Sequence, residues 1–237
     1  MTNPLLEEWA DAMGLRGSLG QIRLDHFRGL SPLNQLMFGP PGRTVDIFRA
    51  REELTRKYAW AVPTPEALRT VAKYAGPGLL SIGAGTGYWE SLLAQLGVNV
   101  LAFDRRPPTE KPFADGGNSH GHTGQFFRVR PGTHRKVRRW PERTPFLSWP
   151  SYGESWACQA ARWTWAEHFV YVGEGEGGCT ADDAFFVYME RAWELIEEVW
   201  IPQWPGIHDR LFVWRRRPAR GLLPVKRKNR AIAGPES

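Results

Sequence analysis

The chain has 237 residues with a hydrophobic content of 42%, which is enough for one substantial core. Its formal net charge is +6, but much of the basic excess lies in residues 135–143 and 215–230, so charge alone does not mark the whole chain as nucleic-acid binding. Its two cysteines make no disulfide framework and no apolar run approaches the roughly 18–20 residues that span a bilayer, which favours a soluble cytoplasmic protein.

Residues 1–64 are predicted to form a mostly helical N-terminal extension, with helices beginning near Pro4 and spanning residues 45–58. A stronger start signal follows at residues 64–66, which have the sequence Thr-Pro-Glu. The threonine can cap a helix, the proline suits the first turn, and the glutamate favours the positive end of the helix dipole. We expect this helix to end at Tyr74.

From residue 79 the apolar pattern changes to alternating strands and helices, which favours a doubly wound α/β fold with a mainly parallel sheet. The helix with the clearest apolar periodicity has Thr180 as its predicted cap. A short connection cannot make a parallel crossover, so the last two strands should form an antiparallel hairpin. Strands are predicted at about 79–82, 98–103, 145–149, 169–172, 200–204 and 210–215, and helices at about 88–96, 154–167 and 182–200. The long segment 105–132 is predicted to be mostly loop.

The most informative motif is Gly-Ala-Gly-Thr-Gly at residues 83–87, directly after a predicted strand and before a helix. Glycine lets the backbone turn sharply and approach a ligand closely. The spacing GxGxG is tighter than the GxGxxG of dinucleotide-binding proteins, and suits a cofactor without a pyrophosphate. Asp104 stands at the end of the next predicted strand, where a carboxylate can accept hydrogen bonds from both ribose hydroxyl groups.

In these motifs the chain resembles the class I S-adenosylmethionine-dependent methyltransferases, over roughly residues 65–216. The resemblance implies a three-layer α/β/α domain around a mainly parallel seven-stranded sheet with an antiparallel final hairpin strand. It also implies S-adenosylmethionine as cofactor, with its methionine portion on the glycine loop. Ser81 departs from the pattern, because many members carry an acid there that contacts the cofactor's ammonium group. The expected cofactor-binding residues are Trp60, Gly83, Ala84, Gly85, Thr86, Gly87, Asp104 and Trp149.

The loop after the predicted strand 145–149 is similar to the (D/N/S)PP(Y/F/W) loop of methyltransferases that act on adenine or cytosine amino groups. Ser148 or Ser151 could accept a hydrogen bond from the methyl acceptor, and Tyr152 could stack on a planar ring. The match is incomplete, because Trp149 and Ser151 replace expected residues. A turn that makes no contact with the acceptor is an equally good interpretation.

Two further segments supply candidate site residues. Tyr58 and Trp60 could form a lid over the cofactor, although ordinary packing of the N-terminal helices is the alternative. Glu174 follows the predicted strand 169–172 at the same sheet edge, although a solvated acidic turn would have a similar sequence. The predicted catalytic residues are Ser148, Tyr152 and Glu174.

Two basic stretches are the reason to consider a nucleic-acid partner. Residues 134–140 combine three arginines with Trp140, and residues 226–230 add a basic cluster. His120 and His122 have an HxH spacing, but no carboxylate or cysteine pair accompanies them, so we expect no metal site.

Three functions remain. The leading hypothesis is a methyltransferase acting on a small-molecule or peptide-like acceptor. The nearest alternative is a nucleic acid N-methyltransferase, and the third is a cofactor-binding protein without catalysis that serves as an interaction module. The expected organisation is an extension or lid at residues 1–64, the cofactor-binding domain at 65–217 and a flexible basic tail at 218–237.

Overall fold

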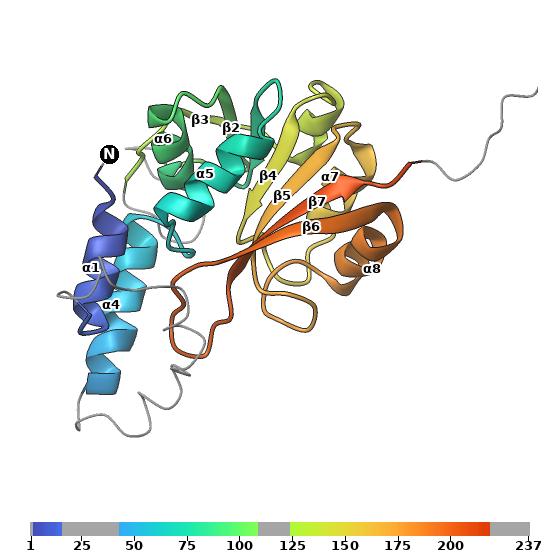
Figure 1. Cartoon of the computed structure of the whole chain (residues 1–237). Helices are drawn as coiled ribbons and strands as arrows, with labels where there is room; N and C mark the ends of the chain where they lie inside the picture. Colours follow the sequence, from blue (N-terminus) through green and yellow to red (C-terminus); the bar gives the residue numbers. More distant parts are fainter. Residues whose placement is uncertain (1, 16–42, 109–123, 219–237) are drawn as a thin grey trace, which may run out of the picture.

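The computed structural model describes residues 2–15, 43–108 and 124–218 (Figure 1). The helices of this part are α1 (Pro4–Ala12), α4 (Arg43–Lys57), α5 (Pro65–Tyr74), α6 (Tyr88–Gln95), the 3-10 helix η2 (His134–Arg138), α7 (Trp156–Trp163) and α8 (Asp183–Ala192). The strands are β1 (Leu79–Ile82), β2 (Val100–Asp104), β3 (Val129–Pro131), β4 (Thr144–Ser148), β5 (His168–Gly173), β6 (Trp193–Trp200) and β7 (Arg210–Arg216).

The strands form a single seven-stranded sheet in the order β3-β2-β1-β4-β5-β7-β6. Neighbouring strands from β3 to β5 pair in parallel, whereas β7 is antiparallel to both β5 and β6. The order reverses beside β1, which lies between β2 and β4, so the topological switch point lies at the end of β1. The prediction of a mainly parallel sheet with an antiparallel final strand is therefore confirmed.

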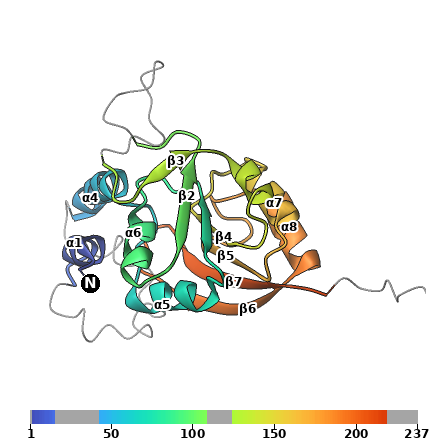
Figure 2. The same ribbon diagram turned by 90° about the horizontal axis from the view of Figure 1, so that it is seen from above.

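Helices cover both faces of the sheet, as Figure 2 shows, with α5 and α6 on one side and α7 and α8 on the other. The strand residues explain this arrangement. In β1, Leu79 packs in the same core as α5 and α6, whereas Leu80 and Ile82 pack in the core that α7 and α8 complete. A strand buried on both faces needs a continuous apolar run, which is the pattern of the sequence here. The three-layer prediction is confirmed.

The predicted start of α5 is also confirmed. The Thr64 side chain accepts a hydrogen bond from the Ala67 backbone N–H at 3.1 Å, and Pro65 occupies the first turn. This cap satisfies one of the backbone donors that a helix leaves unpaired at its beginning.

The predicted helix over residues 182–200 is wrong in its second half. Helix α8 ends at Ala192, and residues 193–200 form strand β6. The predicted cap is wrong as well, because Asp182 rather than Thr180 accepts the Phe185 backbone N–H. The predicted strand over residues 200–204 is also wrong. Strand β6 ends at Trp200, and the rest of the predicted strand belongs to the connection between β6 and β7. The predicted antiparallel hairpin is present, but its first strand begins at Trp193 instead of residue 200.

Two elements in the middle of the chain also differ from the prediction. Residues 129–131 form β3, which pairs in parallel with β2, inside the segment predicted to be mostly loop. Three residues carry too little periodicity for sequence analysis to detect a strand. Helix α7 spans residues 156–163 and is shorter than predicted.

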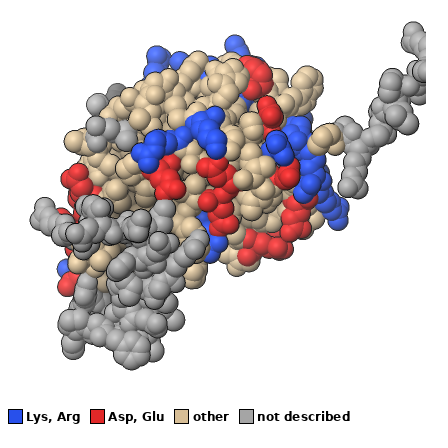
Figure 3. Space-filling model, viewed as in Figure 1, with Lys and Arg blue, Asp and Glu red and all other residues tan. Residues whose placement is uncertain are grey.

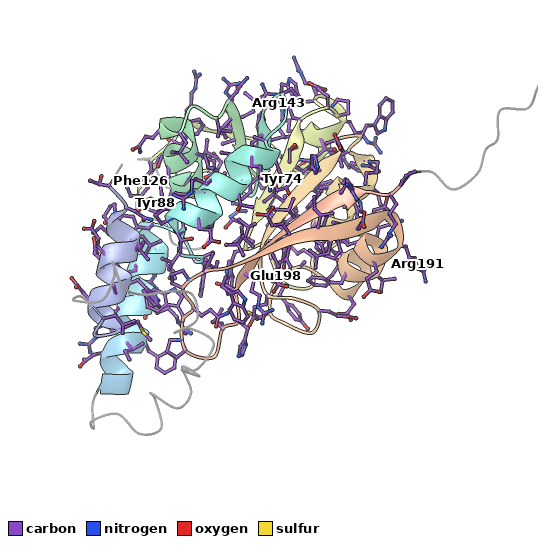
Figure 4. All side chains as sticks on the ribbon, in the orientation of Figure 1. Tyr74, Tyr88, Phe126, Arg143, Arg191 and Glu198 are labelled. Atoms are coloured by element: carbon purple, nitrogen blue, oxygen red, sulfur yellow. The ribbon has the colours of Figure 1, made fainter. Side chains whose placement is uncertain are left out.

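The N-terminal extension packs on the α/β part of the chain instead of standing apart from it. The Tyr88 hydroxyl donates to Asn3 Oδ1 at 2.8 Å, and the Asn3 side chain donates to the Pro63 carbonyl at 2.7 Å. Figure 4 labels Tyr88 beside Phe126, and their rings meet edge to face at a centroid distance of 5.1 Å. Helices α1 and α4 thus share the core of α5 and α6. In the described part of the chain, no helix is both long and apolar enough to cross a membrane.

Candidate functional site

A cavity of about 660 Å³ opens at the carboxyl ends of the parallel strands. The loops after β1, β2, β3 and β4 line it, and residues 58–60 of the N-terminal extension close one side. Its volume lies within the roughly 300–1,000 Å³ that is usual for small-molecule sites. It also lies at the topological switch point, where ligands bind in doubly wound sheets.

The glycine loop provides a close backbone approach on one wall. Gly83, Gly85 and Gly87 have φ values of 73°, 53° and 72°, a left-handed region that favours glycine. A Cβ at Gly83 would lie 3.0 Å from the Trp156 ring, on the side of the cavity. Gly83 through Thr86 line the cavity, whereas Gly87 is the N-cap of α6 and packs against Phe127.

Asp104 faces the cavity from the end of β2. Its Oδ2 accepts a hydrogen bond from the Gly85 backbone N–H at 3.0 Å, and its Oδ1 accepts one from the Arg106 N–H at 2.8 Å. These two bonds orient the carboxylate, and an ionised carboxylate has about four acceptor positions. The predicted pairing of the glycine loop with a carboxylate at the next strand end is therefore present in the fold.

Glu90 is a cavity-lining carboxyl group that sequence analysis missed. Its side chain comes from the first turn of α6, and the Ser81 hydroxyl donates a hydrogen bond to its Oε1 at 2.6 Å. Burial raises the pKa of Glu90 to about 7, and the charge of Asp104 adds to this increase. The sequence signal that could have indicated Glu90 was Ser81. Because position 81 lacks the expected acid, a carboxyl group from a neighbouring segment could take its place.

Aromatic side chains form another part of the cavity wall. The rings of Trp60 and Trp149 stack at a centroid distance of 4.6 Å and an angle of 17°. Trp149 Nε1 donates to the buried Asp209 carboxyl group at 2.9 Å, and the Trp204 indole donates to the Trp60 carbonyl at 3.2 Å. Both tryptophans predicted to bind the cofactor therefore line the cavity in fixed orientations.

The segment 58–60 is tied directly to the glycine loop. The Thr86 hydroxyl donates to the carbonyl of Tyr58, whose ring packs between Tyr88 and Phe126 at centroid distances of 5.0 and 5.3 Å. Helix α4 therefore delivers Tyr58 and Trp60 to the cavity wall, at the place where the sequence predicted a lid.

The loop after β4 brings Ser148 and Tyr152 to the same cavity. Two backbone hydrogen bonds fix this loop, from Gly153 N–H to the Ala181 carbonyl and from Ala181 N–H to the Pro150 carbonyl, at 2.8 and 2.9 Å. Tyr152 is 70% exposed and stands at the mouth. The fold thus gathers the predicted acceptor loop and the predicted cofactor loop around one space.

Glu174 lies outside this lining, in a neighbouring shallow cavity that shares Tyr152 and Cys179 with it. Its carboxylate accepts hydrogen bonds from the backbone N–H groups of Cys179 and His208 at 2.7 and 2.8 Å. Although burial alone would raise the pKa of Glu174, these hydrogen bonds lower it. The geometry favours a role in holding the loop after β5.

In the basic stretch at residues 134–140 the three arginines are exposed, while some side chains also contact rings of the protein itself. Arg138 lies 3.7 Å from the Trp163 ring centroid, and Trp140 stacks on Phe103 at 5.4 Å. On the face in Figure 3, basic and acidic side chains lie beside one another, and ion pairs join β6 to β7 there. His120 and His122 and the tail from residue 219 lie outside the described residues.

No family model and no curated protein matches the chain. Among solved structures, a Burkholderia thailandensis 1,6-didemethyltoxoflavin-N1-methyltransferase with bound S-adenosylhomocysteine is 15% identical, with a TM-score of 0.43 over 76% of this chain and 92% of that one. Magnesium protoporphyrin IX methyltransferase from Synechocystis PCC 6803, with bound S-adenosylmethionine, is 9% identical, with a TM-score of 0.40 over 87% and 97%. The CcbJ methyltransferase from Streptomyces caelestis is 15% identical, with a TM-score of 0.35 over 65% and 97%. Because these similarities are weak, the interpretation of the site rests on the residues of this chain.

Proposed function

We propose that this chain, whose strand order and antiparallel β7 are those of the class I methyltransferase fold, transfers a methyl group from S-adenosylmethionine to a small-molecule acceptor. One observation carries the proposal. A single cavity joins a glycine loop and a strand-end carboxylate on one side to an aromatic wall and a polar loop on the other.

The residues of the first side fit the cofactor. The methionine portion would lie along the backbone of Gly83 and Gly85, two glycines that line the cavity. The ribose would hydrogen bond to Asp104, which lines the cavity at the end of β2. The residues that follow β3 line the same cavity and would border the adenine base.

The second side would hold the acceptor. When bound, S-adenosylmethionine supplies a methyl group on a positively charged sulfur; the acceptor atom forms a bond to the methyl carbon while the carbon–sulfur bond breaks and its electron pair stays on sulfur. Such a displacement depends chiefly on alignment and exclusion of water. Ser148 would accept a hydrogen bond from the acceptor, Tyr152 would cover it at the mouth, and the Trp60–Trp149 pair would exclude water.

A small molecule is favoured over a nucleic acid by the packing of the basic stretch. Trp140, the side chain proposed from sequence to stack on a base, is stacked on Phe103. Two of the nearby guanidinium groups lie over tryptophan rings of the protein itself. Stacking of a base on the Phe103 side of Trp140 would require this contact to open.

The test is methyl transfer in vitro. The purified chain is incubated with methyl-labelled S-adenosylmethionine and fractionated small-molecule extract, and labelled product and S-adenosylhomocysteine are measured. The proposal expects equal amounts of both, produced by the parent and lost in Asp104→Ala. Cofactor binding without turnover in any fraction would favour the non-catalytic alternative. Turnover only with RNA or DNA, with a steep loss at higher salt, would favour the nucleic-acid alternative.

A further inference from the structure

Ser81 and Glu90 form a deeply buried polar contact beside the cavity. Ser81 is 1% exposed and Glu90 is 2% exposed, and the two side chains join the middle of the sheet to the first turn of α6. Because Glu90 lines the cavity, its carboxyl group lies between the protein interior and the space next to the glycine loop.

Within the described part of the chain, the buried Glu90 carboxyl group has no counterion. Among the described residues, no ion pair includes Glu90, and its nearest charged influence is the carboxylate of Asp104 on β2. Asp104 would repel a second negative charge. The other charged or basic side chains along the cavity are Arg105, His134 and Glu154, from the loops after β2 and β3 and the loop before α7. An unpaired buried carboxylate is unfavourable, so a ligand cation is the natural partner for this one.

We propose that Glu90 binds the α-ammonium group of the cofactor, in place of the acid that the motif puts at position 81. The inference rests on the proposed function, since it concerns the amino acid portion of the same ligand. The carboxyl group has moved from the strand to the helix, and Ser81 orients it through the 2.6 Å hydrogen bond. Replacing the acid at one position by an acid at its hydrogen-bonding neighbour keeps one negative charge at the same end of the cavity.

The protonation state of Glu90 should change when the ligand binds. The pKa of about 7 means that much of Glu90 carries a proton at pH 6.5 when the site is empty. An ammonium group beside it would favour the ionised form. Binding should therefore release on the order of half a proton per ligand at pH 6.5, where the ligand amino group is already protonated.

The first experiment compares S-adenosylhomocysteine with 5′-methylthioadenosine, which keeps the adenosine and thioether but lacks the amino acid. Calorimetric titrations use the parent, Glu90→Gln and Ser81→Ala. In Glu90→Gln, we expect S-adenosylhomocysteine to bind about 10- to 100-fold more weakly, because a charged hydrogen bond is lost. Affinity for 5′-methylthioadenosine should change by less than about threefold, because that ligand has no group near Glu90.

Ser81→Ala serves as the matched control, because it removes the orienting hydroxyl and keeps the carboxyl group. A smaller loss for S-adenosylhomocysteine, on the order of tenfold or less, is expected there. An equal loss for both ligands in Glu90→Gln, or no loss for either, would overturn the role of Glu90 while leaving the proposed function intact. If the parent binds neither ligand, the proposed function itself fails.

The second experiment moves the acid back to the strand. The double variant Ser81→Glu with Glu90→Ala places a carboxylate at 81 and opens space at 90. We expect it to bind S-adenosylhomocysteine more tightly than Glu90→Ala alone by about tenfold. No recovery in a folded double variant would contradict the exchange of positions. Titrations in phosphate and imidazole buffers at pH 6.5 then count protons, and release in the parent that persists in Glu90→Gln would contradict the coupling.

Discussion

The two sides of the cavity differ in how the protein holds its polar groups. On the cofactor side, Ser81, Glu90 and Asp104 are buried and joined to backbone or to each other by hydrogen bonds. On the acceptor side, the wall is aromatic, and Tyr152 is largely exposed at the mouth. This contrast indicates that the cofactor side is preorganised for one ligand, while the acceptor side can accommodate different rings.

The largest expected effect is on stability, and it concerns the empty cofactor side. Glu90 has an ordinary pKa of 4.5 and a folded pKa of about 7. The unfolded chain therefore loses this proton at lower pH than the folded chain. Folded stability contributed by protonated Glu90 is fully present below pH 4.5 and is lost as pH rises through 7.

Glu90→Gln removes this titration. Relative to the parent, the variant should gain free energy of unfolding on the order of 3 kcal/mol between pH 4.5 and pH 8. Urea unfolding of both proteins at several pH values measures the difference, in which the other titrating groups largely cancel. If the difference in free energy of unfolding does not change with pH, the pKa of Glu90 is not raised in the folded chain without ligand. The two sides of the cavity would then differ less than we infer.

The next effect is on cofactor affinity. Asp104→Ala should weaken S-adenosylhomocysteine binding by about 10- to 100-fold, because hydrogen bonds to a charged group are lost. Asp183→Ala, which removes an exposed carboxylate from the first turn of α8, is the matched control. Titration calorimetry of both variants checks the prediction. Equal affinities for Asp104→Ala and the parent would show that the ribose is held elsewhere.

A smaller effect tests whether the glycine loop is preformed. Gly87 has a φ of 72°, and a Cβ there would lie 2.8 Å from Phe127 Cβ. Gly87→Ala should lower stability by about 1–3 kcal/mol, because it adds backbone strain and a clash. Gly175→Ala is the control, since its Cβ would meet no atom within 4 Å. Thermal unfolding without ligand compares the two, and equal melting temperatures would argue against a rigid loop.

The smallest expected effect on cofactor binding comes from the acceptor side. Tyr152→Ala should leave stability within about 0.5 kcal/mol and cofactor affinity within about twofold, because the side chain is exposed. Methyl transfer to the active fraction should fall, mainly through a higher KM. Trp165→Ala, which removes an exposed ring outside the cavity lining, should not change KM. An unchanged KM in Tyr152→Ala would exclude this side chain from acceptor binding.

Sequence analysis predicted the elements whose signals are local. The cap at Thr64, the apolar run of β1 and the turn at the glycine loop each depend on a few adjacent residues. The mainly parallel sheet with helices on both faces then followed from the alternation of strands and helices.

Strand β6 shows why other elements were missed. Trp193, Ile196 and Val199 have helical spacing, so they continue the pattern of α8. In the structure a register shift between Leu195 and Glu197 interrupts the alternation that would have marked a strand. Pairing with β7, a contact between distant segments, decides the conformation here.

Glu90 was missed for a related reason. An acidic residue in the first turn of a helix is explained by the helix dipole alone, so it gives no separate sign of a site. Only the fold brings it to Ser81, nine positions earlier on a strand. The Trp60–Trp149 stack also depends on tertiary structure, since the two rings come from segments that are remote in sequence.

The most direct test of the account is a crystal structure of the chain with S-adenosylhomocysteine. We expect the ligand in the cavity beside residues 83–86, its ribose hydroxyl groups on Asp104 and its ammonium group within hydrogen-bond distance of Glu90. A ligand bound at another surface, or an empty cavity at a saturating ligand concentration, would contradict the account.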